Sequence, residues 1–182
     1  MKPSESKYFL AIIPPEPLQS QIQTIKEHFQ KQFHSKGALR SPAHITLHMP
    51  FLWKLKKEEN LIHLLAQASN YQEFTLKLNG FGAFAPKTIF IKNDLCSELE
   101  SFQRELSLYA RRNLNLFNST HNNGFNPHLT VAFRDLKKEM FFEAWTEFEE
   151  KEFTAEFNVS SFWLLKHDGQ KWHAYREFPF GE

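Results

Sequence analysis

The chain lacks most of what disulfide-stabilised, membrane-embedded or highly charged proteins need. It has one cysteine, Cys96, so an internal disulfide cannot form and a thiolate metal site is excluded. Its formal net charge is only +1, which gives no sign of a non-specific nucleic-acid coat. No hydrophobic run approaches membrane-spanning length, and the apolar stretch 8–13 is too short for a secretory signal. We therefore expect a cytoplasmic protein without membrane association.

What the chain has in excess is phenylalanine, with 20 copies among 182 residues. Most of these rings should lie in a hydrophobic core, although a phenyl face at a cleft can also stack a nucleobase. Phe51 and Phe84 are the two candidates for such stacking, with core packing as the alternative for each. The length predicts that residues 1–182 form a single domain of two lobes that share one core.

Hydrophobic periodicity predicts strands and helices that follow one another along the whole chain. We expect strands at 8–13, 45–51, 74–81, 88–92, 129–133, 157–166 and 171–178, and helices at 17–33, 58–68, 96–113 and 140–149. Polar loops are expected at 35–42 and 115–127. The dipeptide Asp168-Gly169 between the last two strands indicates a hairpin turn. Hairpins and alternating strands favour an α+β fold with antiparallel or mixed sheets and helices outside.

Two short strings, His44-Ile45-Thr46-Leu47 and His128-Leu129-Thr130-Val131, share one pattern of histidine, apolar, threonine, apolar. In a β-strand the histidine and threonine of each string point to one face and the apolar residues to the other. Composition alone predicts roughly 0.07 copies of such a string, so two copies point to a shared role. A helical and then an alternating stretch follow each string. This internal repeat predicts two related lobes with one His/Thr pair in each.

Two imidazoles and two hydroxyls in one cleft are suited to phosphodiester chemistry. Histidine titrates near neutral pH, so one ring can accept a proton from the attacking group while the other protonates the leaving oxygen. Threonine hydroxyls can donate to the phosphate oxygens as charge builds there. Arg134, if its strand continues that far, and His48 share the parity of the two pairs and are further candidates for contact with the substrate.

The paired strings, the stretch 80–84 before a strand and the C-terminal hairpin resemble the 2H phosphoesterase superfamily. Within it they are most similar to the 2′-5′ RNA ligase family, also described as RNA 2′,3′-cyclic phosphodiesterases. The resemblance implies a bilobal, pseudo-two-fold α+β fold in which two antiparallel sheets face a central cleft and helices lie outside. It implies that His44 and His128 are catalytic and that Thr46 and Thr130 bind phosphate. It also implies cleavage of cyclic or 2′-linked phosphodiesters at RNA ends or in small nucleotides, with 2′-5′ ligation as the reverse reaction.

Other interpretations of the sequence remain open. The same scaffold without catalysis would bind RNA ends or nucleotides, and a structural protein would carry the histidines incidentally. The run 166–169 resembles the lysine motif of ATP-dependent nucleotidyltransferases, but only thirteen residues follow it and Asp-Gly already accounts for a turn. His44 and His48 would need further ligands to hold a metal, and a Gly-rich phosphate loop is absent from the sequence. We therefore expect no metal, no ATP and no other cofactor, and we predict no protein partner.

Overall fold

The computed structural model describes residues 4–118 and 124–181. Its strands form one antiparallel sheet in the order β6-β3-β4-β5-β2-β1-β7-β8. The strands are β1 (Glu5–Ile12), β2 (Ile45–Lys54), β3 (Phe74–Phe84), β4 (Thr88–Asn93), β5 (His128–Ala132), β6 (Thr154–Val159), β7 (Ser161–His167) and β8 (Trp172–Pro179). The helices are α1 (Leu18–Phe33), α2 (Glu58–Ala66), α3 (Ser97–Leu114) and α4 (Lys138–Phe148), with short 3₁₀ turns at Gly37–Arg40 and Leu55–Lys57.

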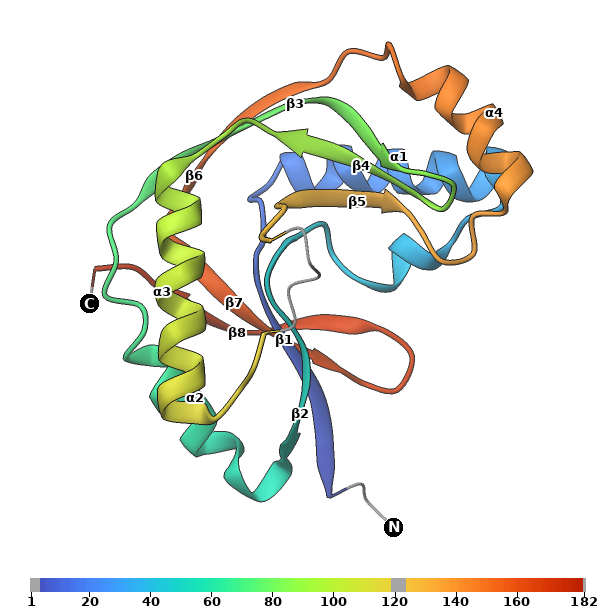
Figure 1. Cartoon of the computed structure of the whole chain (residues 1–182). Helices are drawn as coiled ribbons and strands as arrows, with labels where there is room; N and C mark the ends of the chain where they lie inside the picture. Colours follow the sequence, from blue (N-terminus) through green and yellow to red (C-terminus); the bar gives the residue numbers. More distant parts are fainter. Residues whose placement is uncertain (1–3, 119–123, 182) are drawn as a thin grey trace.

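The sheet divides into two halves that meet at its centre. We call β2-β1-β7-β8 the first lobe and β6-β3-β4-β5 the second lobe. In the described part of the chain, the strands of the two lobes pair with each other only between β2 and β5, where the paired position is Ile45 with Leu129. The expected α+β class and antiparallel pairing are confirmed, and the two expected sheets turn out to be joined edge to edge into one curled sheet (Figure 1).

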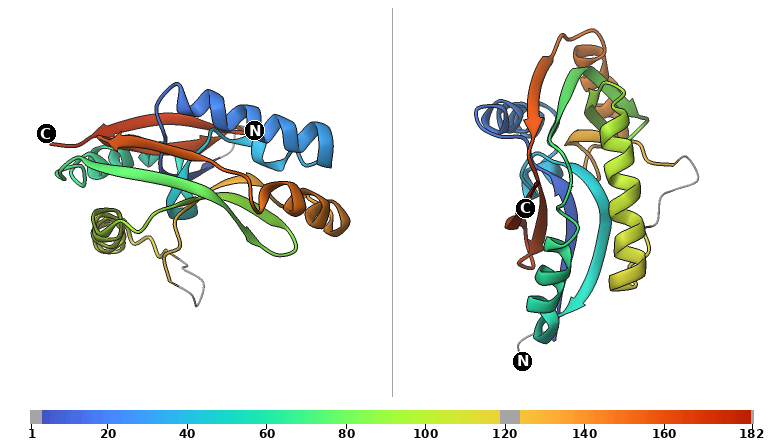
Figure 2. Two further views of the ribbon diagram at one scale, coloured as in Figure 1. Left: turned by 90° about the horizontal axis from the view of Figure 1, so that it is seen from above. Right: turned by 90° about the vertical axis from the view of Figure 1, so that its left-hand side faces the viewer.

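Each of the two long helices, α1 and α3, follows a strand of one lobe in the sequence but packs against the other lobe. Helix α1 comes after β1 of the first lobe, yet it contacts β5 and α4 of the second. Helix α3 comes after β4 of the second lobe, yet it contacts β2 and α2 of the first. The two helices lie on opposite sides of the strands (Figure 2). This exchange ties the lobes together and fixes how the two His/Thr strings face each other.

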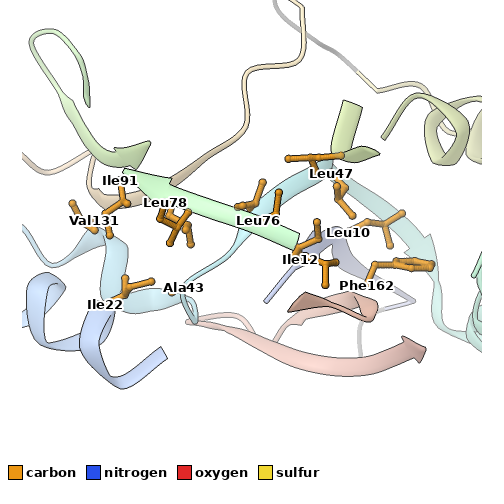
Figure 3. Close-up of a cluster of buried hydrophobic side chains, with 14 of the residues drawn as sticks. Leu10, Ile12, Ile22, Ala43, Leu47, Leu76, Leu78, Ile91, Val131 and Phe162 are labelled. Carbon is orange, nitrogen blue, oxygen red and sulfur yellow. The ribbon is translucent and has the colours of Figure 1, made fainter. Parts of the chain in front are cut away.

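One cluster of buried hydrophobic side chains extends through both lobes (Figure 3). Ile22 of α1 lies near Val131 of β5 at one end, and Leu10 and Leu47 of the first lobe lie near Phe162 at the other. The helical stripe that predicted α1 supplies Leu18, Ile22 and Phe29 to this cluster. Burial of such a continuous apolar surface is the main stabilising contribution available to the fold.

The C-terminal segment differs from expectation in one respect. The predicted strand 157–166 is broken at Ser160 into β6, which pairs with β3, and β7, which pairs with β1. The chain therefore crosses from the second lobe to the first within a stretch that the sequence predicts as one strand. The hairpin is confirmed: Gly169 has φ of 104°, and the Asp168 carboxylate accepts from the N–H groups of Gln170 and Lys171. The lysine of that run, Lys166, pairs with Glu58 at 2.5 Å.

The expected loop 115–127 has no regular structure at 115–118 and 124–127, and its residues 119–123 lie outside the described part. Among the helices that the structure describes, none combines the length and the hydropathy needed to cross a membrane.

Candidate active site

The two His/Thr strings lie side by side at the centre of the sheet. Ile45 pairs with Leu129 in the antiparallel ladder. Continuing that register by one residue in each direction sets His44 opposite Thr130 and Thr46 opposite His128. The apolar members of both strings are buried, whereas both histidines and both threonines are half-buried on the other face. The four residues predicted from the strings are therefore brought together on one face.

Both imidazoles are held by the same backbone contact. His44 Nδ1 lies 2.8 Å from the carbonyl oxygen of Pro42, and His128 Nδ1 lies 2.7 Å from that of Asn126. A carbonyl oxygen only accepts hydrogen bonds, so Nδ1 of each ring carries a proton and donates. In the neutral ring the lone pair is then on Nε2, which is left for a ligand. The two histidines thus present equivalent nitrogens, as the internal repeat predicts.

Burial favours the neutral form of both rings. It lowers the pKa of His44 to about 4, a shift opposed by the hydrogen bond to Pro42 and increased by the positive charges of Lys26 and His128. Burial also lowers the pKa of His128, again opposed by its backbone hydrogen bond. An anion bound between the rings would raise both pKa values, because it stabilises the charged imidazolium. The site is therefore neutral when empty and gains a proton most readily together with an anionic ligand.

An aromatic ring from a neighbouring strand covers each histidine. The ring of Phe9 on β1 lies 4.9 Å from that of His44, and the ring of Phe90 on β4 lies 4.7 Å from that of His128. Phe84 contacts both Phe90 and His128 and is 42% exposed, so this candidate does lie at the site. Sequence reasoning missed Phe9 and Phe90, because each stands in a strand whose residues on both faces are apolar.

Trp172 and Trp163 extend the aromatic surface of the first lobe. Trp172 meets Phe9 edge to face at 4.6 Å, and both tryptophans pack on the small cluster formed by Phe9, Ala11 and Leu165. Both tryptophans are half-buried. A partly exposed aromatic ring therefore lies beside His128 in one half of the site, in Phe84, and beside Phe9, which covers His44, in the other, in Trp172.

Gly82 gives Phe90 the room to cover His128. It pairs with Phe90 across β3 and β4, and a Cβ atom there would lie 2.5 Å from the Phe90 ring. We expect Gly82→Ala to displace the ring and to raise the pKa of His128, because burial is what lowers that pKa. Titration of the His128 ring protons by NMR measures the shift. In a Phe90→Ala variant, Gly82→Ala should have little further effect on the pKa of His128. An equal shift in that variant would show that Gly82 does not act through the Phe90 ring.

His48 and Phe51 lie away from the two pairs. The register between β1 and β2 shifts around Leu10, so that Ala11 pairs with Thr46 but Leu10 pairs with His48. An irregularity of this kind adds a residue to one strand and reverses the side of those after it. His48 is 1% exposed, its ring meets Phe51, and Phe51 in turn stacks on Tyr8 in the main hydrophobic cluster. The parity argument that placed His48 beside His44 therefore fails at this bulge.

Arg134 lies beyond the end of its strand. β5 ends at Ala132, and Arg134 follows in a bend with φ of 62°, its guanidinium over the ring of Phe133. Strand parity therefore does not apply to Arg134, whose side chain is exposed. A role for it in substrate contact stays a prediction without support from the strand geometry.

Acidification is expected to destabilise the protein through His44. Its pKa is about 4 in the folded chain and near 6.5 in an unfolded one, so the unfolded chain takes up the proton first as pH falls. The contribution of neutral His44 to the free energy of unfolding is fully present above about pH 6.5. It falls by about 3 kcal/mol as the pH approaches 4. Urea denaturation at about pH 7 and about pH 4.5 measures the loss, which should be smaller in His44→Asn. An equal loss in both proteins would contradict this assignment.

In residues 4–118 and 124–181, no three His, Cys, Asp or Glu side chains are placed so that they could hold a metal ion. The expectation of a cofactor-free site is not tested by this observation.

Comparison with known proteins gives a family and a fold. A family model described as 2′-5′ RNA ligase superfamily matches residues 14–171. No curated protein matches the sequence.

Three solved structures illustrate the likeness of fold. Escherichia coli LigT complexed with 3′-AMP has a TM-score of 0.66 and 18% identity, covering 98% of this chain and 99% of that chain. TT0787 of Thermus thermophilus has a TM-score of 0.64 and 16% identity, covering 96% and 97%. Kluyveromyces marxianus Usb1 has a TM-score of 0.52 and 12% identity, covering 97% and 99%.

Proposed function

Because the chain belongs to the 2′-5′ RNA ligase superfamily, within the 2H phosphoesterases, we propose that it hydrolyses 2′,3′-cyclic or 2′-linked phosphodiesters by general acid and base catalysis. The observation that carries the proposal is the pairing of Ile45 with Leu129 across β2 and β5, a register that, continued by one residue, sets His44 opposite Thr130 and Thr46 opposite His128. This arrangement sets an imidazole and a hydroxyl on either side of one central position. A phosphorus atom there would have a proton acceptor and a proton donor on opposite sides, as in-line displacement requires.

The reaction uses Nε2 of both histidines. One neutral ring accepts the proton of the attacking water, and the other, charged through its interaction with the bound phosphate, protonates the ribose oxygen that leaves. The P–O bond to that oxygen breaks as the bond to water forms, and the product is a phosphomonoester. The threonine hydroxyls donate to the non-bridging oxygens, where negative charge builds in the transition state. With the histidine roles exchanged, the same groups would join two ends through a 2′-5′ bond.

The proposed ligands are RNA ends or small nucleotides. Phe84 beside His128 and Trp172 beside Phe9 offer partly exposed rings on which a base can stack. Solved structures with this fold hold such compounds: Escherichia coli LigT is described in complex with 3′-AMP, phosphate, NADP⁺ and ATP. The cytoplasmic location expected from the sequence stays a prediction.

A panel of 2′,3′-cyclic nucleotides and 2′-5′ dinucleotides tests the proposal, with the product isomers identified by chromatography. We expect turnover to a single phosphomonoester isomer, with a bell-shaped pH profile and with full activity in EDTA. Binding of these compounds without turnover would instead indicate a nucleotide-binding module. Loss of activity in EDTA would overturn the metal-independent mechanism.

A further inference from the structure

Helix α1 holds the three residues that lead into His44. The side-chain amide of Gln19 donates to the carbonyl of Ala43 at 2.6 Å and accepts from its N–H at 3.0 Å. Lys26 Nζ donates to the carbonyl of Ser41 at 3.0 Å. The carbonyl between them, that of Pro42, is the one that accepts from His44 Nδ1. The backbone that orients His44 is therefore fixed on both sides of its contact with the ring.

Lys26 is an unusual residue to find in this position. It is 1% exposed and lies one turn after Ile22 on the buried stripe of α1, where a hydrophobic side chain is expected. In the part of the chain that the structure describes, no carboxylate pairs with it. Burial of an unpaired ammonium is costly, and here it lowers the pKa of Lys26 to about 8, which leaves most of the molecules charged at neutral pH. A positive charge in the interior beside the site needs a reason other than packing.

We propose that Lys26 is a positioning residue for His44: it anchors the segment 41–43 through the Ser41 carbonyl and, by its positive charge, adds to the effect of burial, which favours the neutral, proton-accepting form of the His44 ring. The inference rests on the proposed function for the use of His44 as a proton acceptor. The negative charge of a bound phosphodiester would also offset the unfavourable free energy of the buried Lys26 ammonium. Burial of this lysine would therefore favour substrate binding.

The groups that face His44 allow this effect to be isolated. Lys26 acts on it from α1 and His128 from β5, the Pro42 carbonyl accepts from its Nδ1, and Phe9 covers its ring. No carboxylate contributes to the shift of its pKa. Removal of the Lys26 charge should therefore raise the pKa of His44, while the effects of burial and of His128 remain.

The test is an NMR titration of the His44 ring protons in the ligand-free protein, which needs no substrate. We expect Lys26→Met to raise the pKa of His44 by about one unit and Lys26→Arg to keep it close to that of the unmodified protein. Lys31→Met is the matched control, because Lys31 is exposed on the same helix and the change in net charge is identical. Gln19→Leu loosens the segment without changing charge, so it should lower kcat without the rise in the pKa of His44 that removal of the Lys26 charge produces.

A folded Lys26→Met protein with an unchanged His44 pKa would overturn the proposal, and so would an equal shift in Lys31→Met. Circular dichroism establishes folding, and Lys26→Gln serves if the methionine variant does not fold. With an active substrate, the acid limb of kcat/KM in Lys26→Met should move to higher pH by the same amount. If no substrate is turned over, the proposed function fails while the titration still decides the role of Lys26.

Discussion

Replacing either His44 or His128 by alanine is expected to lower the turnover of a 2′,3′-cyclic phosphate by about 10²–10⁴-fold. In the proposed mechanism each ring performs one of the two proton transfers, and its Nδ1 contact with a backbone carbonyl leaves Nε2 as the reacting atom. Because the two transfers serve one step, the double variant should be little worse than the poorer single variant. Initial rates with a cyclic nucleotide at the pH optimum measure the loss.

The control for the histidine variants is His63→Ala, which removes an exposed imidazole from α2. It should retain full activity. Neither site variant should lose stability at neutral pH beyond the contacts of one half-buried ring, so circular dichroism should show a folded chain. A histidine variant that keeps wild-type turnover would remove that residue from the mechanism. One that unfolds would show that the ring belongs to the packing of the lobe.

Replacing Thr46 or Thr130 by valine is expected to lower kcat by about 10²–10³-fold, with a smaller change in KM. Valine has nearly the shape of threonine but lacks the hydroxyl donor. The register of Ile45 with Leu129, continued by one residue, sets each threonine opposite the histidine of the other lobe, so in the proposed mechanism either hydroxyl donates to the phosphate oxygens between the rings. Since charge on those oxygens grows toward the transition state, the loss should fall on kcat.

Serine variants at the same two positions keep the hydroxyl and should retain most of the activity. Thr75→Val is a matched control, because Thr75 is exposed on β3, near the far edge of the second lobe. If a valine variant raises KM alone, that threonine binds ground state and transition state equally. If serine is no better than valine, the hydroxyl is not the group that acts.

Local patterns in the sequence were sufficient for most of the secondary structure. The stripe Leu18, Ile22 and Phe29 predicts α1, and Asp168-Gly169 predicts the C-terminal turn, because each depends on neighbours along the chain. Lys26 could have been noticed in the same way, since a lysine interrupts the apolar face of a helix. Its distance from His44 could not, because that depends on α1 packing across to the other lobe.

The misplaced elements share one physical cause. Alternation along a strand reports which side chains share a face only while the strand is regular and unbroken. The shift at Leu10 turns His48 into the core, the break at Ser160 divides one apparent strand between two lobes, and the end of β5 leaves Arg134 in a bend. Bulges and strand ends follow from pairing with distant segments, which a local pattern does not contain.

The sequence by itself determined the chemical groups: two histidines and two threonines, each pair on one face of its strand, with apolar residues beneath. It also determined the family, because the same string occurs twice in matching surroundings. Only the tertiary structure decided that β2 and β5 are neighbours with Ile45 paired to Leu129. Continued by one residue, this register sets each histidine opposite the threonine of the other lobe. It alone added Phe9, Phe90 and Lys26, since these reach the site across strand pairs and helix packing. Residue type and spacing are local properties, whereas register, facing and burial arise from contacts between segments far apart in the chain.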